Sequence, residues 1–364
     1  MSQQTEARAE AAESGQRHHF NPGFDRFSGL YLLALFIIVF GIWVPDKFLT
    51  TATLHSIASE QAIVAMLGLA VLIPLSAGVF DLSIGAMINM SAIVVSLLQV
   101  KHGWPMVPSI IAAIIVTTFI GFVNGFLVVK LQISAFIATL GSATIIGAFQ
   151  VIITNQSQPL PPTSTAWNNL TQQKIFGFQI VFLYLIVLAL IAWWVMDHTP
   201  PGRYIYATGG NPEAARLSGV KVGMWVWLSF VASGFVCGIA GVLYASQNGP
   251  SLTFGASLLL PAYAAAFLGS TQLKPGRFNV WGTIIAVYVL AIGVKGLSLV
   301  TSVQWLNAMF NGVALLAAVA FAGWEQRRSA ARRRAGEHAR PEAPPTESPP
   351  PLEGQPATES PSPA

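Results

Sequence analysis

Long apolar runs recur along this chain, and they restrict its fold more than any other feature. Two of them, residues 107–129 and 177–196, contain no Asp, Glu, Lys or Arg. About 20 apolar residues in a helix cross the hydrocarbon core of a bilayer. Charged residues make up 9% of the chain, whereas a soluble domain carries about 25%. We therefore expect an all-α polytopic membrane protein.

The apolar pattern predicts about ten transmembrane helices, some of them short or broken. In chain order they are 29–43, 57–77, 84–100, 107–129, 135–153, 177–196, 224–245, 258–273, 280–299 and 305–321. An even number of spans places both termini on the same side. Most of the 19 Lys and Arg residues lie in the tails or in loops on the side of the tails, which the positive-inside rule identifies as the cytoplasm.

The same pattern divides the chain into three parts. Residues 27–324 form the predicted membrane domain, preceded by a cytoplasmic tail at 1–26. The tail at 325–364 is first basic and then rich in Pro, Glu and Ser. Such a composition does not form a packed core, so we expect both tails to be disordered.

A polar segment at 199–223 separates two apolar runs and carries clear signals for one short helix. Asn211 can cap its first N–H groups, and Pro212 suits the first helical position. Gly219 can end the helix in a left-handed conformation. A helix over 212–218 is too short to be stable alone. We interpret it as a cytoplasmic docking element, and a solvated loop with one helical turn is the alternative.

Enzymatic motifs are absent from the sequence. It contains no G-x-x-x-x-G-K-[ST] loop, so we do not expect the chain to bind or hydrolyse ATP. It also lacks metal-ligand spacings and a nucleophile elbow, and its single cysteine, Cys237, lies within an apolar run. We expect no catalytic residue, no metal and no cofactor in this chain. The basic pI of about 9.3 reflects loops and tails and predicts no nucleic-acid partner.

Two carboxylates and two prolines are candidates for a transport pathway. Glu60 and Asp81 are the only acidic residues in 47–196. An ionisable group inside a membrane often has a function. The predicted topology places Asp81 at a cytoplasmic turn, where it could equally cap the next helix. It places Glu60 near the outer interface, where we expect it to be solvated. Pro74 and Pro261 predict broken or kinked helices, which are tolerated beside a cavity.

Four motifs, in order along the chain, resemble those of the permeases of sugar ABC importers of the ribose, xylose and arabinose type. They are GVFDLSIG at 78–85, GFVNGFLV at 121–128 with FIATLG at 136–141, the segment 202–219, and AAAFLG at 264–269 with 276–282. The resemblance covers roughly 30–322. The chain departs from the pattern at Val79-Phe80, where many relatives have Gly-Ile, and at Lys274-Pro275, where they often have small residues.

The resemblance implies a set of partners in the inner membrane of a bacterium. It implies a second permease chain, identical or similar, surrounded by lipid. It also implies a cytoplasmic ATPase pair that binds ATP and Mg²⁺, and a periplasmic solute-binding protein that delivers a sugar or sugar-like molecule. By this resemblance the ATPase-coupling residues are Gly209, Gly210, Asn211, Pro212, Glu213, Ala214, Ala215, Arg216, Leu217, Ser218 and Gly219. The candidate pathway or gating residues are Asp81, Ser83, Asn124, Pro74 and Pro261.

Two other classes of membrane protein are possible. An ion-coupled secondary transporter needs acidic groups or an ion site near the bilayer midplane, and the predicted topology puts both Asp81 and Glu60 near interfaces. A scaffold without transport would not need helices broken by proline. The sequence therefore favours a permease subunit that is driven by ATP hydrolysis in another chain.

Overall fold

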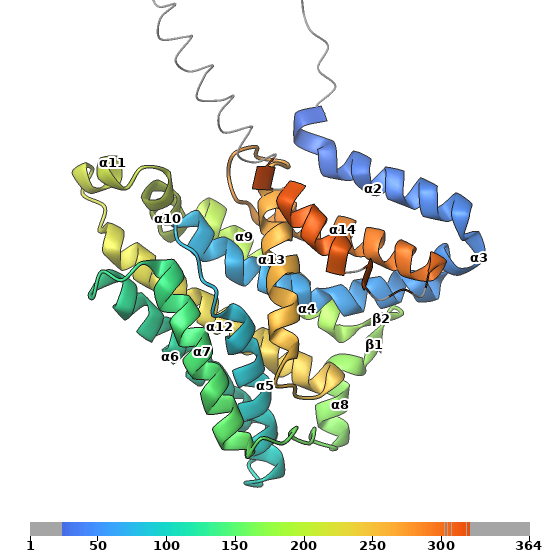
Figure 1. Ribbon diagram of the computed structural model, residues 1–364, viewed down its shortest axis with the longest axis horizontal. Coiled ribbons are helices and arrows are strands. Elements are labelled where there is room, and N and C mark those ends of the chain that lie inside the picture. Colours follow the sequence, from blue (N-terminus) through green and yellow to red (C-terminus); the bar gives the residue numbers. More distant parts are fainter. Residues whose placement is uncertain (1–23, 302, 304, 307, 318, 321–364) are drawn as a thin grey trace, which may run out of the picture. The chain divides into compact units, whose positions relative to one another are not determined.

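The computed structural model describes residues 24–301, 303, 305–306, 308–317 and 319–320. Its elements are α2 (Phe24–Trp43), α3 (Pro45–Phe48), α4 (Thr51–Ser76), α5 (Ile84–Val100), α6 (Met106–Val129), α7 (Ala135–Thr154), α8 (Thr165–Gln172), β1 (Lys174–Ile175), β2 (Phe178–Gln179), α9 (Ile180–His198), α10 (Pro200–Gly210), α11 (Pro212–Leu217), α12 (Val222–Asn248), α13 (Phe254–Ser270) and α14 (Val280–Val300), shown in Figure 1. A further apolar helix covers Ala308–Ala317.

Each predicted apolar run corresponds to a helix in the described part of the chain. Six of these helices, α4, α6, α7, α9, α12 and α14, are long and apolar enough to cross a membrane. The shorter apolar helices are Gly29–Trp43 within α2, α5, α13 and Ala308–Ala317. The all-α polytopic architecture is therefore confirmed. The tails predicted to be disordered fall almost entirely outside the described residues.

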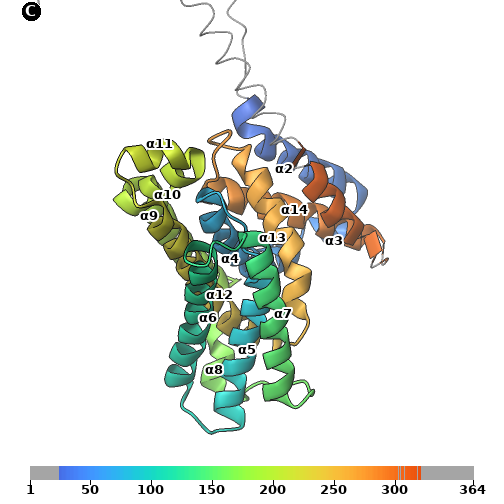
Figure 2. The ribbon, with the colours of Figure 1, turned by 60° about the vertical axis from the view of Figure 1, so that its left-hand side comes forward.

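Helix α4 forms the centre of the bundle. In its most apolar stretch of 18 residues, 83% of the residues are buried, against 22% for α6 and for α7. The outward faces of α6 and α7 carry exposed apolar side chains, among them Phe119 and Ile137. Helices that are apolar all round suit a membrane or a protein interior. Figure 2 shows α6 and α7 on the outside of the bundle, with α5 beside α7.

Small residues allow α6 and α12 to pack closely, as the spacing of Gly121 and Gly125 predicts. A Cβ atom added to Gly121 would overlap the carbonyl oxygen of Phe230, and one added to Gly125 would overlap the ring of Trp227. Gly234 of α12 lies equally close to the backbone of α6. These glycines therefore have a packing role.

The polar segment 154–176, which lies between two predicted spans, contains α8 and β1, and β1 pairs with β2 in an antiparallel hairpin. Ser164 caps α8 by accepting a hydrogen bond from the backbone of Trp167, whose side chain is completely buried. The hairpin turn places Phe176 and Gly177 at φ +51° and +85°. Such turns favour Asn-Gly or Asp-Gly, so a Phe-Gly pair gives no recognisable signal.

The sequence predicts that the two prolines break or kink their helices, and neither proline breaks one. Helix α13 continues through Pro261 from Phe254 to Ser270, so a break at this residue is wrong. Pro74 lies in the last turn of α4, which ends at Ser76. Without an N–H group, Pro74 cannot bond to the carbonyl four residues before it, so α4 lacks one hydrogen bond in its last turn.

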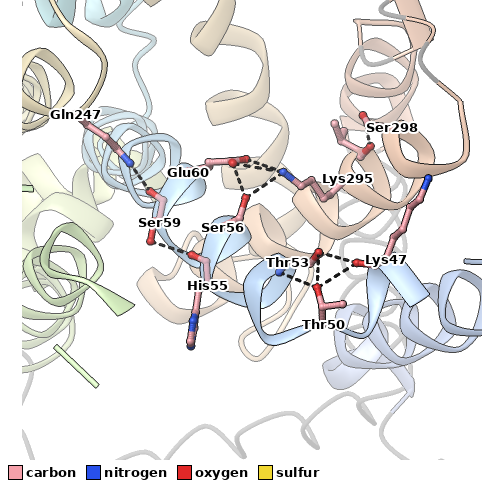
Figure 3. A network of polar contacts seen from close by, with 11 residues as sticks. Lys47, Thr50, Thr53, His55, Ser56, Ser59, Glu60, Gln247, Lys295 and Ser298 are labelled. Carbon is pink, nitrogen blue, oxygen red and sulfur yellow. Dashed lines mark hydrogen bonds and ion pairs between the residues drawn. The ribbon is translucent and has the colours of Figure 1, made fainter. Parts of the chain in front are cut away.

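At the other end of α4, a polar network joins α4 to α14 (Figure 3). Lys295 Nζ lies 3.3 Å from the carboxylate oxygens of Glu60 and 3.0 Å from Ser56 Oγ. The Glu60 side chain is 53% exposed. Glu60 is thus not merely solvated, as expected, but ion-paired. Such an exposed pair contributes about 1 kcal/mol or less to stability.

Candidate functional site

The break between α4 and α5 buries a carboxylate inside the bundle. Gly78, at φ +83°, turns the chain, and Asp81 follows with no exposed surface. Its Oδ1 atom accepts hydrogen bonds from the backbone N–H of Ser83 at 3.1 Å and from the Ser83 hydroxyl at 2.6 Å. Its Oδ2 atom accepts a hydrogen bond from the Ser233 hydroxyl of α12 at 2.9 Å. Both oxygens are therefore held by neutral donors.

Side chains from three further helices hold this break in place. The Tyr263 hydroxyl of α13 accepts from the backbone N–H of Asp81 at 3.1 Å and donates to its carbonyl oxygen at 2.9 Å. Thr139 Oγ1 of α7 accepts from the N–H of Leu82 at 3.1 Å. Asn124 Nδ2 of α6 donates to Ser83 Oγ at 2.8 Å. The break is thus a junction of α5, α6, α7, α12 and α13.

The sequence places Asp81 at a cytoplasmic turn and does not predict that its side chain is buried. In the structure five helices close around it and leave it with no exposed surface. It accepts the N–H of Ser83, the residue just before α5, but the Ser83 side chain makes no capping bond to the first turn of the helix. In the described part of the chain it forms no ion pair, so its burial depends on hydrogen bonds alone. Burial of a carboxylate is costly without such bonds.

The sequence predicted some of the residues that form this junction. Asp81, Ser83 and Asn124, all predicted as pathway or gating residues, form one hydrogen-bonded chain. The partners Ser233, Thr139 and Tyr263 were missed, and only Thr139 lies within a recognised motif. One oxygen of the junction, Asn124 Oδ1, is buried and accepts no hydrogen bond from the described residues.

The two prolines lie outside the hydrogen-bonded junction. Pro74 precedes the break by one helical turn. Pro261 lines a cavity of about 380 Å³ together with the polar side chains of Gln61, Ser257 and Asn311. The cavity lies between α4, α13, α14 and the helix at Ala308–Ala317. Pro261 therefore lies beside a cavity, as expected, although it does not break its helix.

Phe80, which belongs to the Val79-Phe80 pair that departs from the family pattern, lies against the junction. Phe80 stacks on the ring of Tyr263, with the ring centroids 6.1 Å apart. Its side chain is 43% exposed, although its neighbour Asp81 is completely buried. The break therefore presents an aromatic face outward and a carboxylate inward.

The short helix predicted in the polar segment is present as α11. Asn211 Oδ1 accepts from the backbone N–H of Ala214 at 3.0 Å, and Pro212 occupies the first position. Gly219, at φ +83°, ends the helix, and the N–H of Val220 bonds to the carbonyl of Ala215 at 3.0 Å. This is a Schellman-type end. The helix finishes at Leu217, one residue before the predicted bound.

The outer face of α11 is unusual for a polar segment. Glu213 and Arg216 form an ion pair at 3.3 Å, with 76% and 66% of their side chains exposed. Leu217 is 89% exposed beside them. Only Ala215 of this helix is buried. The helix thus presents one large apolar side chain beside two charged groups.

A second helix, α10, was not predicted and connects α11 to the rest of the bundle. Figures 1 and 2 show α10 and α11 together at one end of the bundle. A Cβ atom added to Gly209 of α10 would overlap the carbonyl oxygen of Ser76. Gly78 lies against the backbone of Gly209. The polar segment therefore contacts the chain directly where the break begins.

Comparison with known proteins agrees with this architecture. The family model for the permease component of branched-chain amino acid transport systems matches residues 53–319. The fructose import permease protein of Rhizobium meliloti is 30% identical over 306 residues, which cover 81% of this chain and 84% of that protein. The D-allose transport system permease protein of Escherichia coli K12 is 26% identical, covering 87% and 97%. The ribose import permease protein of Haemophilus influenzae is 28% identical, covering 79% and 90%. The chain therefore belongs to this family of transport permeases, among its sugar ABC importer members.

Proposed function

We propose that this chain is the membrane-spanning permease subunit of an ABC importer that carries a sugar or a sugar-like solute. The observation that carries the proposal is α11, a capped helix at one end of an apolar bundle. Its exposed ion pair includes Arg216, a residue type that is enriched at the centres of protein interfaces, and it lies beside the exposed Leu217. The relatives named above, which import fructose, allose and ribose by their names, support a sugar as the solute.

The distribution of basic residues supports the orientation and location of the chain. Both tails and the end of the bundle with α10 and α11 face the cytoplasm of a bacterium, and the chain lies in its inner membrane. The α8 segment and the hairpin then face the periplasm. In this arrangement an ATPase subunit docks on α11, and a solute-binding protein delivers the solute to the opposite face. A second permease chain completes the pathway.

The junction around Asp81 is the proposed gate. Five helices meet there through hydrogen bonds set within the apolar core, and these bonds can exchange partners between two arrangements of the helices. ATP, which the partner subunit binds with Mg²⁺, would favour one arrangement over the other. Coupling of this kind is typically worth about 1–3 kcal/mol. The chain itself performs no covalent chemistry in this proposal.

Co-purification and transport test the proposal together. The full chain is expressed with the ATPase encoded beside it and purified by a tag on the permease. The complex is then placed in proteoliposomes with the solute-binding protein and tested with radiolabelled ribose, fructose and allose. We expect the ATPase to co-purify, and the binding protein to stimulate both ATP hydrolysis and uptake. Uptake that follows an ion gradient without any ATPase would contradict the proposal and establish a secondary transporter.

Replacing Glu213 and Arg216 together with alanine tests the docking helix in the same assay. Loss of ATPase binding is the expected result, because both side chains are exposed and neither stabilises the bundle. Lys130→Gln is the control, since Lys130 is also an exposed cation in a turn at the end of a helix. Unchanged assembly and transport in the double variant would contradict docking through α11.

A further inference from the structure

A partly buried carboxylate, Asp197, lies near the end of α9 and binds two cations at once. Its Oδ2 atom is 2.7 Å from Lys274 Nζ, and its Oδ1 atom is 3.4 Å from Arg277 Nη2. The Asp197 side chain is only 10% exposed. Solvent and salt screen such a carboxylate less than an exposed one. Both cations come from the turn between α13 and α14, so Asp197 fixes that turn to α9.

The same turn is also bound to α10. The guanidinium carbon of Arg277 lies 3.6 Å from the centre of the Tyr206 ring, a cation–π contact. The Tyr206 hydroxyl donates a hydrogen bond to the carbonyl oxygen of Phe278 at 2.7 Å. Burial raises the pKa of Tyr206 above its ordinary value. Arg277 therefore holds α9 and α10 at the same time.

Helix α10 lies between the docking helix and the proposed gate. It leads directly into α11 through Asn211, and its Gly209 contacts the start of the break before α5. On its other side, Tyr206 and Arg277 attach it to the turn that ends α13. Tyr263 of α13 holds the backbone of Asp81. Two routes from α11 to the gate therefore pass through α10, beside the direct one along α12, which follows α11 and carries Ser233.

We propose that Asp197 is a positioning residue that makes α9, α10 and the α13–α14 turn move as one body. A displacement of α11 by the ATPase then reaches α13 and the Asp81 junction. The inference rests on the proposed function and assigns a role to Lys274, which departs from the family pattern. Without Asp197 the turn would lose its anchor on α9, and α11 could move while α13 stays behind.

The first experiment separates this role from folding and docking. Asp197→Asn keeps the shape of the side chain and removes its charge. It is compared with the unmodified chain and with Lys130→Gln in the reconstituted complex, and the readout is solute uptake per ATP hydrolysed. We expect normal co-purification of the ATPase, continued ATP hydrolysis and an uptake ratio at least about fivefold lower. Arg277→Lys keeps the charge but loses the planar group. Its uptake per ATP hydrolysed should therefore lie between those of the unmodified chain and of Asp197→Asn.

A cross-linking experiment tests the common movement directly. Asp197→Cys and Lys274→Cys are combined in a chain whose own cysteine is replaced by Cys237→Ala. A thiol cross-linker long enough to replace the lysine side chain then joins the two positions. We expect the uncross-linked double variant to be poorly coupled and the cross-linked one to recover uptake, because a covalent link replaces the ion pair.

The possible outcomes distinguish failure of the role proposed for Asp197 from failure of the proposed function. An unmodified chain without ATP-driven uptake would overturn both. A functional unmodified chain with an unchanged uptake ratio in Asp197→Asn would overturn the inference alone. Uptake that stops on cross-linking would also overturn it, because the two elements would then have to separate during transport. If Asp197→Asn fails to assemble, the cross-linked variant decides, and recovered uptake supports the inference.

Discussion

The Oδ2 atom of Asp81 lies 2.9 Å from the hydroxyl oxygen of Ser233, a residue 152 positions further along the chain. This hydrogen bond joins the break after α4 to the middle of α12. Tyr263 of α13 binds the backbone of the same aspartate. The geometry of the proposed gate thus depends on the relative positions of helices that are distant in sequence.

Ser233→Ala should destabilise the protein, because it leaves one oxygen of a buried carboxylate without its donor. A loss of this kind costs about 1–3 kcal/mol. Ser229→Ala is the matched control on the same helix, since Ser229 is equally buried but donates only to the carbonyl of Val226, three residues before it. Melting temperatures of both variants in the same detergent provide the measurement. Equal losses would show that the bond to Asp81 has no special weight.

Asp81→Asn should reduce uptake at least about fivefold and leave ATPase binding intact. The amide nitrogen cannot accept a hydrogen bond, so the bond that Ser233 donates to Oδ2 must reverse or break, while Oδ1 can keep the two bonds from Ser83. Glu60→Gln is the control, because Glu60 is a carboxylate of the preceding helix α4 and is half exposed. Uptake in proteoliposomes should separate the two variants. Similar uptake in both would argue against a gate at Asp81.

Gly209→Ala should disturb the contact between α10 and the break before α5. The added methyl group would overlap the carbonyl oxygen of Ser76, and overpacking of this kind costs about 1–3 kcal/mol. Gly210→Ala provides a close control, since a Cβ atom there has no neighbour within 4 Å. We expect a lower melting temperature and weaker coupling only for the first variant. Identical behaviour of the two would show that this contact is not tight.

Leu217→Ser should weaken binding of the ATPase without changing the stability of the permease. The side chain is 89% exposed, so its removal costs the isolated chain little. At a docking surface it would be buried, and a tenfold loss of affinity corresponds to about 1.4 kcal/mol. Leu131→Ser is the control, because Leu131 is 54% exposed in the turn after α6. Titration of the purified ATPase onto each variant measures the difference. Equal affinity would place the docking surface elsewhere.

Hydropathy and local helix signals determined much of this fold. The apolar runs predicted the positions of the membrane helices because the cost of placing polar groups in lipid acts on each stretch of about 20 residues separately. Helix α11 was predicted almost to the residue, because Asn211, Pro212 and Gly219 act on backbone groups within a few positions of themselves. Signals of this kind need no knowledge of the tertiary structure.

The tertiary structure alone decided how these helices meet. Neither the burial of Asp81 nor its bond to Ser233 has a local signal, and the same is true of the Arg277 stack on Tyr206. The sequence placed Asp81 at a cytoplasmic turn, and counting spans does not show whether the side chains of such a turn are buried inside the bundle. Hydrogen bonds between distant segments form only after the helices have packed, and packing depends on the shapes of many side chains together.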